Sequence, residues 1–172
     1  MSEANSFAHA FLSLTLASKT AERRPKSHFT KTYKKRRIEK VSGVTMSKIL
    51  VIEDDDVARE LMQMALKARG HDVSVAENGV AGYDTAVFTK PDLIVTDIQM
   101  PGADGVHVVR RVRDTPSLEQ TPILVTTAFG TGTATFALQL GADAYEPKPL
   151  NPQSFLTTVE RLLVTQNTKK AA

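Results

Sequence analysis

Several apolar runs of this sequence end in side chains that can do chemistry. Glu53 and Asp54 follow the first run, Asp97 ends the third, Thr127 ends the fourth, and Lys148 comes soon after the last. Carboxylates gathered in one place repel one another unless a cation such as Mg²⁺ neutralises them. A lysine and a hydroxyl can stabilise a transferring phosphoryl group, which a carboxylate can accept as an aspartyl phosphate. The set indicates Mg²⁺-dependent phosphoryl acceptance, provided that the fold brings these residues together.

The elements that must position these residues are alternating strands and helices. Short apolar runs predict five strands, at residues 49–52, 73–75, 93–95, 122–125 and 142–145. Apolar residues at helical spacing predict five helices with these core positions: Leu61, Met64, Ala65 and Ala68; Ala81, Val87 and Phe88; Val106, Val109 and Val112; Ala134, Ala137 and Leu138; Phe155, Leu156, Val159, Leu162 and Leu163. This alternation is typical of a parallel sheet covered on both faces. Ligands bind such sheets at the carboxyl ends of the strands, where the reactive residues stand.

The predicted helix ends carry ordinary capping residues. Asp55 and Asp56 are placed to cap and begin the first helix, Asn78 the second, and Asn151 the last. Glycine at 70 and 141 is suited to end the first and fourth helices. These signals fix the boundaries around the reactive side chains.

Composition excludes several classes of protein. The chain has 172 residues, 41% of them apolar and 24% charged, which is ordinary for a globular domain. It has no cysteine, which excludes disulfides, thiolate zinc sites and a cysteine nucleophile. No apolar run approaches the length of a membrane span, so no membrane association is predicted. The four histidines (His9, His28, His71 and His107) show no ligand spacing and are predicted to lie on the surface or in loops.

The charge of the chain is divided between two parts. Residues 1–45 carry ten Lys and Arg against three acidic residues, a net charge of +7, and the remainder has a net charge of −4. The basic run within 1–45 predicts a disordered extension. An arm that contacts nucleic acid is an alternative, and so is a start-site artefact, because Met46 stands directly before the first strand. The predicted domain occupies residues 46–168, followed by a tail at 169–172.

Four segments, in order, resemble the receiver domain of two-component response regulators. They are ILVIEDD at 49–55, PDLIVTDIQMP at 91–101 followed by Asp104-Gly105, TTA at 126–128, and GADAYEPKPL at 141–150. The resemblance covers residues 48–166. It implies a flavodoxin-like, doubly wound α/β fold with five parallel strands in the order 2-1-3-4-5 and five helices.

The resemblance also assigns roles in the site. It implies that Asp97 is the phosphoacceptor and that Mg²⁺ is held by Glu53, Asp54, Asp97 and the backbone carbonyl of Gln99. Asp54 would bind the metal directly and Glu53 mainly through water. Lys148 would pair with the phosphoryl oxygens.

A switch pair and two modulating positions follow from the same resemblance. Thr127 and Tyr145 match a hydroxyl and an aromatic ring that move on phosphorylation, with Thr126 as a competing candidate. Ala128 and Phe129 would modulate the site, and we expect the Phe129 ring to shield the acyl phosphate from water. A cis Lys148–Pro149 peptide would aim the lysine inward.

The expected function is that of a stand-alone, chemotaxis-regulator-like receiver in the cytoplasm. It would take a phosphoryl group from a histidine kinase or a histidine phosphotransfer protein and signal to a protein target through residues 131–165. It would not be a turnover enzyme. The alternatives are a nucleic-acid-binding regulator that uses the basic arm, a receiver scaffold that works without phosphorylation, and a phosphohydrolase. The phosphohydrolase is disfavoured because Gln99 stands where a second catalytic aspartate is needed.

Overall fold

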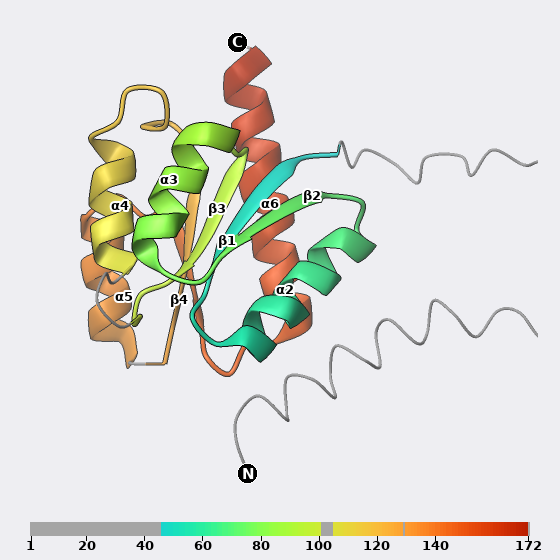
Figure 1. The fold of residues 1–172 in the computed structure, drawn as a ribbon, viewed down its shortest axis with the longest axis vertical. Coiled ribbons are helices and arrows are strands. Elements are labelled where there is room, and N and C mark those ends of the chain that lie inside the picture. The colour runs from blue at the N-terminus through green and yellow to red at the C-terminus, as the bar shows by residue number, and fades with distance from the viewer. Residues whose placement is uncertain (1–45, 101–104, 129, 172) are drawn as a thin grey trace, which may run out of the picture.

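The computed structural model describes residues 46–100, 105–128 and 130–171, and within them the chain forms one parallel sheet. Its strands are β1 (Lys48–Ile52), β2 (Asp72–Ala76), β3 (Leu93–Asp97), β4 (Ile123–Thr127) and β5 (Ala144–Pro147). All neighbours pair in parallel, in the order β2-β1-β3-β4-β5 (Figure 1). The predicted doubly wound, flavodoxin-like sheet order is confirmed. The last strand begins two residues later than predicted.

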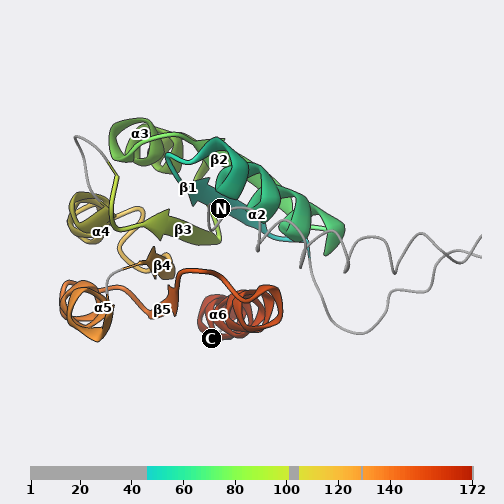
Figure 2. The same cartoon turned by 90° about the horizontal axis from the view of Figure 1, so that it is seen from below.

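Helices cover both faces of this sheet. They are α2 (Asp56–Ala68), α3 (Gly79–Thr89), α4 (Gly105–Arg113), α5 (Gly130–Gln139) and α6 (Pro152–Ala171). Figure 2 shows α2 and α6 on one face and α3, α4 and α5 on the other. One buried apolar cluster lies between the sheet and the α2–α6 layer, and a second lies between the sheet and the layer of α3, α4 and α5. Because β1, β3 and β4 lie between these layers, their apolar residues are buried on both faces.

The predicted capping residues form the helix ends. Asp55 accepts a hydrogen bond from the Ala58 amide at 2.7 Å, and Asn78 accepts one from the Ala81 amide at 2.9 Å. Asn151 accepts two, from the second and third residues of α6. Gly141 follows α5 with a φ of 111°, a left-handed conformation that glycine adopts without strain. These caps set where each strand-to-helix loop begins.

Some predicted core positions are wrong. Phe88 is 90% exposed and Val87 is also exposed, whereas Ala86 is fully buried. The reason is the close approach of α3 to β1: a Cβ at Gly82 would lie 2.5 Å from Ile52. Small residues therefore form the inner face of α3, and the large apolar ones point outward. Met64, Ala68 and Leu138 are also exposed, because other residues of α2 and α5 face the sheet.

His71 is also buried, which corrects its predicted surface position. It lies between α2 and β2 with 6% of its surface exposed, and neither ring nitrogen has a hydrogen-bond partner among the described residues. Burial lowers the pKa of His71, helped by Arg69 and opposed by Glu160. Charging this ring in the folded state is therefore unfavourable.

We expect His71 to make the protein less stable in mild acid. A depressed pKa means that the unfolded chain binds this proton first, so the free energy of unfolding falls as the pH drops through about 6.5, the ordinary histidine value. Urea unfolding between pH 5 and 8 measures this slope. His71→Leu should flatten it. Equal slopes in the wild type and His71→Leu would contradict the expectation.

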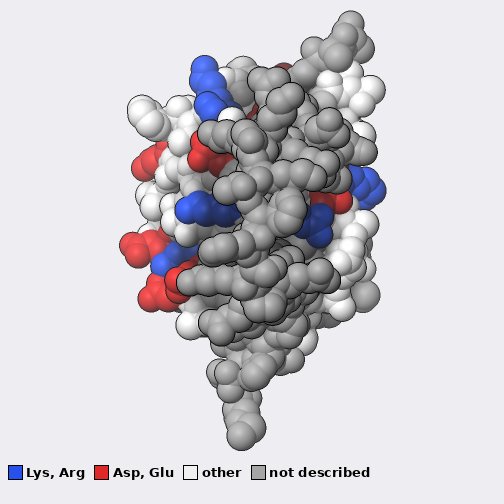
Figure 3. All heavy atoms as spheres, turned by 90° about the vertical axis from the view of Figure 1, so that its right-hand side faces the viewer, with Lys and Arg blue, Asp and Glu red and all other residues white. Residues whose placement is uncertain are grey.

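The predicted extension at 1–45 lies outside the described residues. At the other end, α6 stays helical through Ala171, past the predicted boundary at 168. On the face shown in Figure 3, basic and acidic side chains of the described residues lie interspersed. No helix in the described part of the chain is long and apolar enough to cross a membrane.

Candidate functional site

The carboxyl ends of four strands bring the predicted residues to one edge of the sheet. Glu53 directly follows β1, Asp97 ends β3, Thr127 ends β4, and Lys148 directly follows β5. Glu53, Asp97 and Thr127 are buried, whereas Asp54 is exposed. All four side chains lie at the ends of strands that are consecutive in the sheet, β1, β3, β4 and β5, although they are far apart in sequence.

Lys148 joins the two buried carboxylates. Its Nζ lies 2.6 Å from Asp97 Oδ2 and 2.9 Å from the Glu53 carboxylate. Asp97 Oδ1, the other oxygen, accepts a hydrogen bond from the Gln99 amide at 3.0 Å. Both oxygens of Asp97 are thus held, one by a cation and one by the backbone, which fixes the orientation of the carboxylate.

The backbone around Lys148 aims this side chain at the site. Its amide donates to the Thr127 carbonyl at 2.8 Å, which continues the β4–β5 pairing past the end of β5. The Lys148–Pro149 peptide is cis, as the resemblance implies. The Ile98 amide likewise donates to the Thr126 carbonyl at 3.0 Å, so the chain after Asp97 leaves the sheet in a defined direction.

The electrostatics of the site are those of crowded carboxylates beside one cation. Burial, opposed by the charge of Lys148 and assisted by the charge of Asp97, raises the pKa of Glu53 to about 7. Burial lowers the pKa of Lys148, but its hydrogen bond to Asp97 and the charges of both carboxylates outweigh this effect and raise it. The lysine is therefore charged, but its single positive charge does not balance the negative charges of the neighbouring carboxylates.

The donor set fits a magnesium ion. Glu53, Asp54 and Asp97 each offer a carboxylate oxygen, and these oxygens lie within 4.8 Å of one another. Hard oxygen donors, two of them buried and one exposed, suit an ion that takes few carboxylates and keeps several waters. This is the kind of acidic pocket for Mg²⁺ that the resemblance implies.

Gly105, at the start of α4, lies against the end of β3. A Cβ at this position would lie 2.1 Å from the Asp97 carbonyl oxygen, and the Gly105 amide donates to the Ile98 carbonyl at 2.9 Å. The contact is with backbone, which cannot move aside as a flexible side chain can. No residue other than glycine fits here without shifting the chain next to Asp97.

We expect Gly105→Ala to lower the free energy of unfolding by about 1–3 kcal/mol, the usual cost of overpacking, and to slow phosphorylation at Asp97. Urea unfolding and the rate of phosphoryl uptake measure the two effects. The matched control is Gly132→Ala in α5, where a Cβ meets nothing within 4 Å. This control should gain up to about 1 kcal/mol, because alanine favours the helix. Equal stability of the two variants would contradict the steric argument.

The predicted switch residues lie at different depths. Thr127 is buried, and Tyr145 on β5 is 40% exposed. Thr126, the competing candidate, has a buried hydroxyl without a hydrogen-bond partner among the described residues. Ala128 is exposed. Phe129 falls outside the described residues, so its predicted shielding role stays a prediction.

Two features of the site edge were missed by sequence reasoning. Arg59 on α2 donates to the Glu53 carbonyl at 2.7 Å and pairs with Asp56. Glu146 on β5 is buried and accepts hydrogen bonds from Ser154 and Thr158 of α6. Of these contacts, only the Asp56–Arg59 ion pair could be predicted from sequence, because the two residues stand three apart on one helix. The contacts of Arg59 with Glu53 and of Glu146 with α6 join separate elements.

Comparison with known proteins agrees with this geometry. Residues 49–160 match the model of the response regulator receiver domain. The chain is 38% identical over 117 residues to the response regulator MprA of Mycobacterium sp. (strain KMS), a match that covers 67% of this chain and 50% of that protein. The chain spans about half the length of the curated relatives it matches.

Solved structures show the same fold. The chemotaxis response regulator CheY4 of Vibrio cholerae is 29% identical, with a TM-score of 0.65, covering 69% of this chain and 99% of CheY4. The signal receiver domain of a signal transduction histidine kinase from Syntrophus aciditrophicus is 28% identical, with a TM-score of 0.64, covering 69% of this chain and 91% of that domain.

The fold and site define a signalling module built on a doubly wound sheet with an acidic pocket at the carboxyl ends of its strands. The chain belongs to the response regulator receiver domains of two-component systems. Proteins of this family receive phosphoryl groups from histidine kinases and act on downstream targets.

Proposed function

We propose that Asp97 of this chain accepts a phosphoryl group from a phosphohistidine donor in a Mg²⁺-dependent reaction. The donor would be a histidine kinase or a histidine phosphotransfer protein. The observation that carries the proposal is the position of Asp97: it is buried, it is held by the Gln99 amide, and it lies 2.6 Å from the ammonium group of Lys148.

The chemistry is a transfer between two nucleophiles. A carboxylate oxygen of Asp97 forms a bond to phosphorus, the P–N bond of the donor breaks, and the imidazole leaves with the electron pair. Glu53, Asp54, Asp97 and the Gln99 carbonyl would hold Mg²⁺, which when bound neutralises charge on the phosphoryl oxygens. Lys148 stabilises the same charge from the β5 side of the site.

The signal is proposed to leave the domain through residues 131–165, which include α5, β5 and most of α6. Thr127 and Tyr145 would form the switch, since a new anion at Asp97 offers the Thr127 hydroxyl a hydrogen-bond partner. A switch that moves from 1:99 to 99:1 needs about 5.5 kcal/mol of differential stabilisation. The receiver acts by binding a protein target in the cytoplasm and does not turn over a substrate.

The metal requirement tests the proposal. Incubation of the full chain with acetyl phosphate and Mg²⁺ should add one phosphoryl group, measured by intact-protein mass, and EDTA should abolish this gain. Asp54→Asn should raise the Mg²⁺ concentration needed for half-maximal phosphoryl uptake at least about tenfold, because it removes one of a few anionic ligands. Asp84→Asn, an exposed acid of α3, is the control. Equal uptake with and without Mg²⁺ would overturn the magnesium role.

A further inference from the structure

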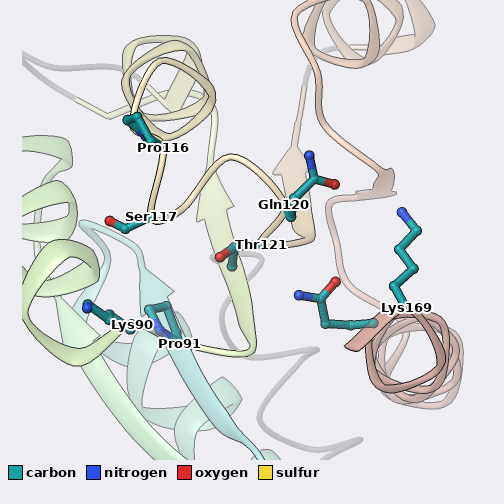
Figure 4. A pocket seen from close by; sticks show the side chains of 8 residues that line it. Lys90, Pro91, Pro116, Ser117, Gln120, Thr121 and Lys169 are labelled. Atoms are coloured by element: carbon teal, nitrogen blue, oxygen red, sulfur yellow. The ribbon is translucent and has the colours of Figure 1, made fainter. Parts of the chain in front are cut away.

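A cavity of about 520 Å³ lies at the amino ends of the strands, far from the phosphorylation site. Figure 4 shows it between the α3–β3 connection, which contributes Lys90, the turn before β4, which contributes Thr121, and the end of α6, which contributes Lys169. Asp97 ends β3 at the opposite edge of the sheet. The cavity is therefore no part of the acidic site.

Two buried polar side chains line this cavity without a protein partner. Thr121 and Gln166 are each only 7% exposed, and neither side chain forms a hydrogen bond to another of the described residues. Polar groups buried to this degree are nearly always hydrogen-bonded, because leaving one unpaired costs about 1–3 kcal/mol. The polar atoms of these two side chains are not among the solvent-inaccessible atoms without a partner, so they face the cavity, where a ligand can replace water as their hydrogen-bond partner.

The charge of the lining selects the kind of partner. Lys90 and Lys169 are the charged side chains among the described residues that line the cavity, and no carboxylate lies there. Ser117 and Gln120 add further hydrogen-bond donors on the rim. Both lysines are exposed, and their long flexible side chains can turn toward a ligand. A lining rich in donors and positive charge suits an acceptor-rich anion.

We propose that this cavity binds a small organic anion that carries a phosphate or carboxylate group. The buried Gln166 amide and Thr121 hydroxyl hold its polar atoms, and the two lysines neutralise its charge. The volume lies in the range of sites for small molecules. Because the site faces away from Asp97, binding and phosphorylation do not compete.

Backbone amide NMR of the full chain tests the site with two probes. Adenosine monophosphate represents the organic phosphates and citrate the carboxylates, each compared with NaCl at equal ionic strength. We expect saturable shifts at residues 90, 117–121 and 166–169 with at least one probe. The probe that saturates identifies the group that the site prefers. Shifts that NaCl reproduces, or that do not saturate with either probe, would overturn the proposal.

Variants separate a built site from general attraction to lysines. Lys90→Gln combined with Lys169→Gln should weaken binding at least tenfold without touching the core. Gln166→Leu should weaken it as well, and Lys67→Gln, an exposed lysine of α2, should leave it unchanged. Equal loss in Lys67→Gln and in the double variant would show charge attraction alone. Asp97→Asn should bind the probe like the wild type, which keeps this result independent of phosphorylation.

Discussion

Asp97→Asn is expected to abolish phosphorylation, lowering phosphoryl uptake from acetyl phosphate by at least about 10³-fold. The amide keeps the shape of the side chain and can still accept from the Gln99 amide, but it has no anionic oxygen to form the bond to phosphorus. The substitution also removes one of the two negative charges that the Lys148 ammonium faces, and the Glu53 carboxylate remains. Intact-protein mass after incubation with acetyl phosphate and Mg²⁺ measures the effect.

The control for this variant is Asp114→Asn, which changes an exposed acid beyond α4. It should be phosphorylated like the wild type. Far-ultraviolet circular dichroism and thermal unfolding of Asp97→Asn should show an intact fold, because no packing group is removed. A full phosphoryl gain in Asp97→Asn would mean that another residue is the acceptor and would refute the assignment.

Lys148→Met should have the second largest effect, slowing phosphorylation by about 10²–10³-fold, the usual result of removing one group that stabilises transition-state charge. It should also lower the free energy of unfolding in the absence of Mg²⁺. Methionine keeps much of the side-chain volume but leaves Glu53 and Asp97 buried without their shared cation. Addition of Mg²⁺ should then stabilise the variant more than the wild type, because no lysine competes for the carboxylates.

Rates of phosphoryl uptake and thermal unfolding with and without Mg²⁺ measure these two effects. Lys67→Met, at the exposed end of α2, is the matched control and should change neither quantity. Lys148→Arg keeps the charge but not the compact ammonium, so it should recover stability more fully than rate. If Lys148→Met lost stability but kept the wild-type rate, the lysine would serve only as a counterion.

The sequence alone was enough to predict the sheet and the residues at its edge. Continuous apolar strands with helices between them specify a parallel sheet, and the chain direction then places every strand end at the same edge. Glu53, Asp97 and Lys148 could be grouped on that basis before any distance was known. Capping residues such as Asp55 and Asn151 were also readable, because a cap acts within a few residues of its own position.

Contacts between separate elements were decided only by the tertiary structure. Spacing along α3 favoured Phe88 and Val87 as core residues, but the approach of Gly82 to Ile52 turns the small residues inward. His71 was predicted at the surface and is buried between α2 and β2, where α6 supplies Glu160 nearby.

The same physical reason explains what was found only in the structure. Local signals depend on neighbours in sequence, whereas burial depends on which surfaces meet across the sheet. The cavity lined by Thr121 and Gln166 joins residues 45 positions apart, and neither belongs to a motif. The sequence by itself therefore determined the fold class, the strand ends and the chemistry at their edge. The tertiary structure decided the depth of each side chain, the pairing of Lys148 with both carboxylates, and the second polar site at the opposite end of the sheet.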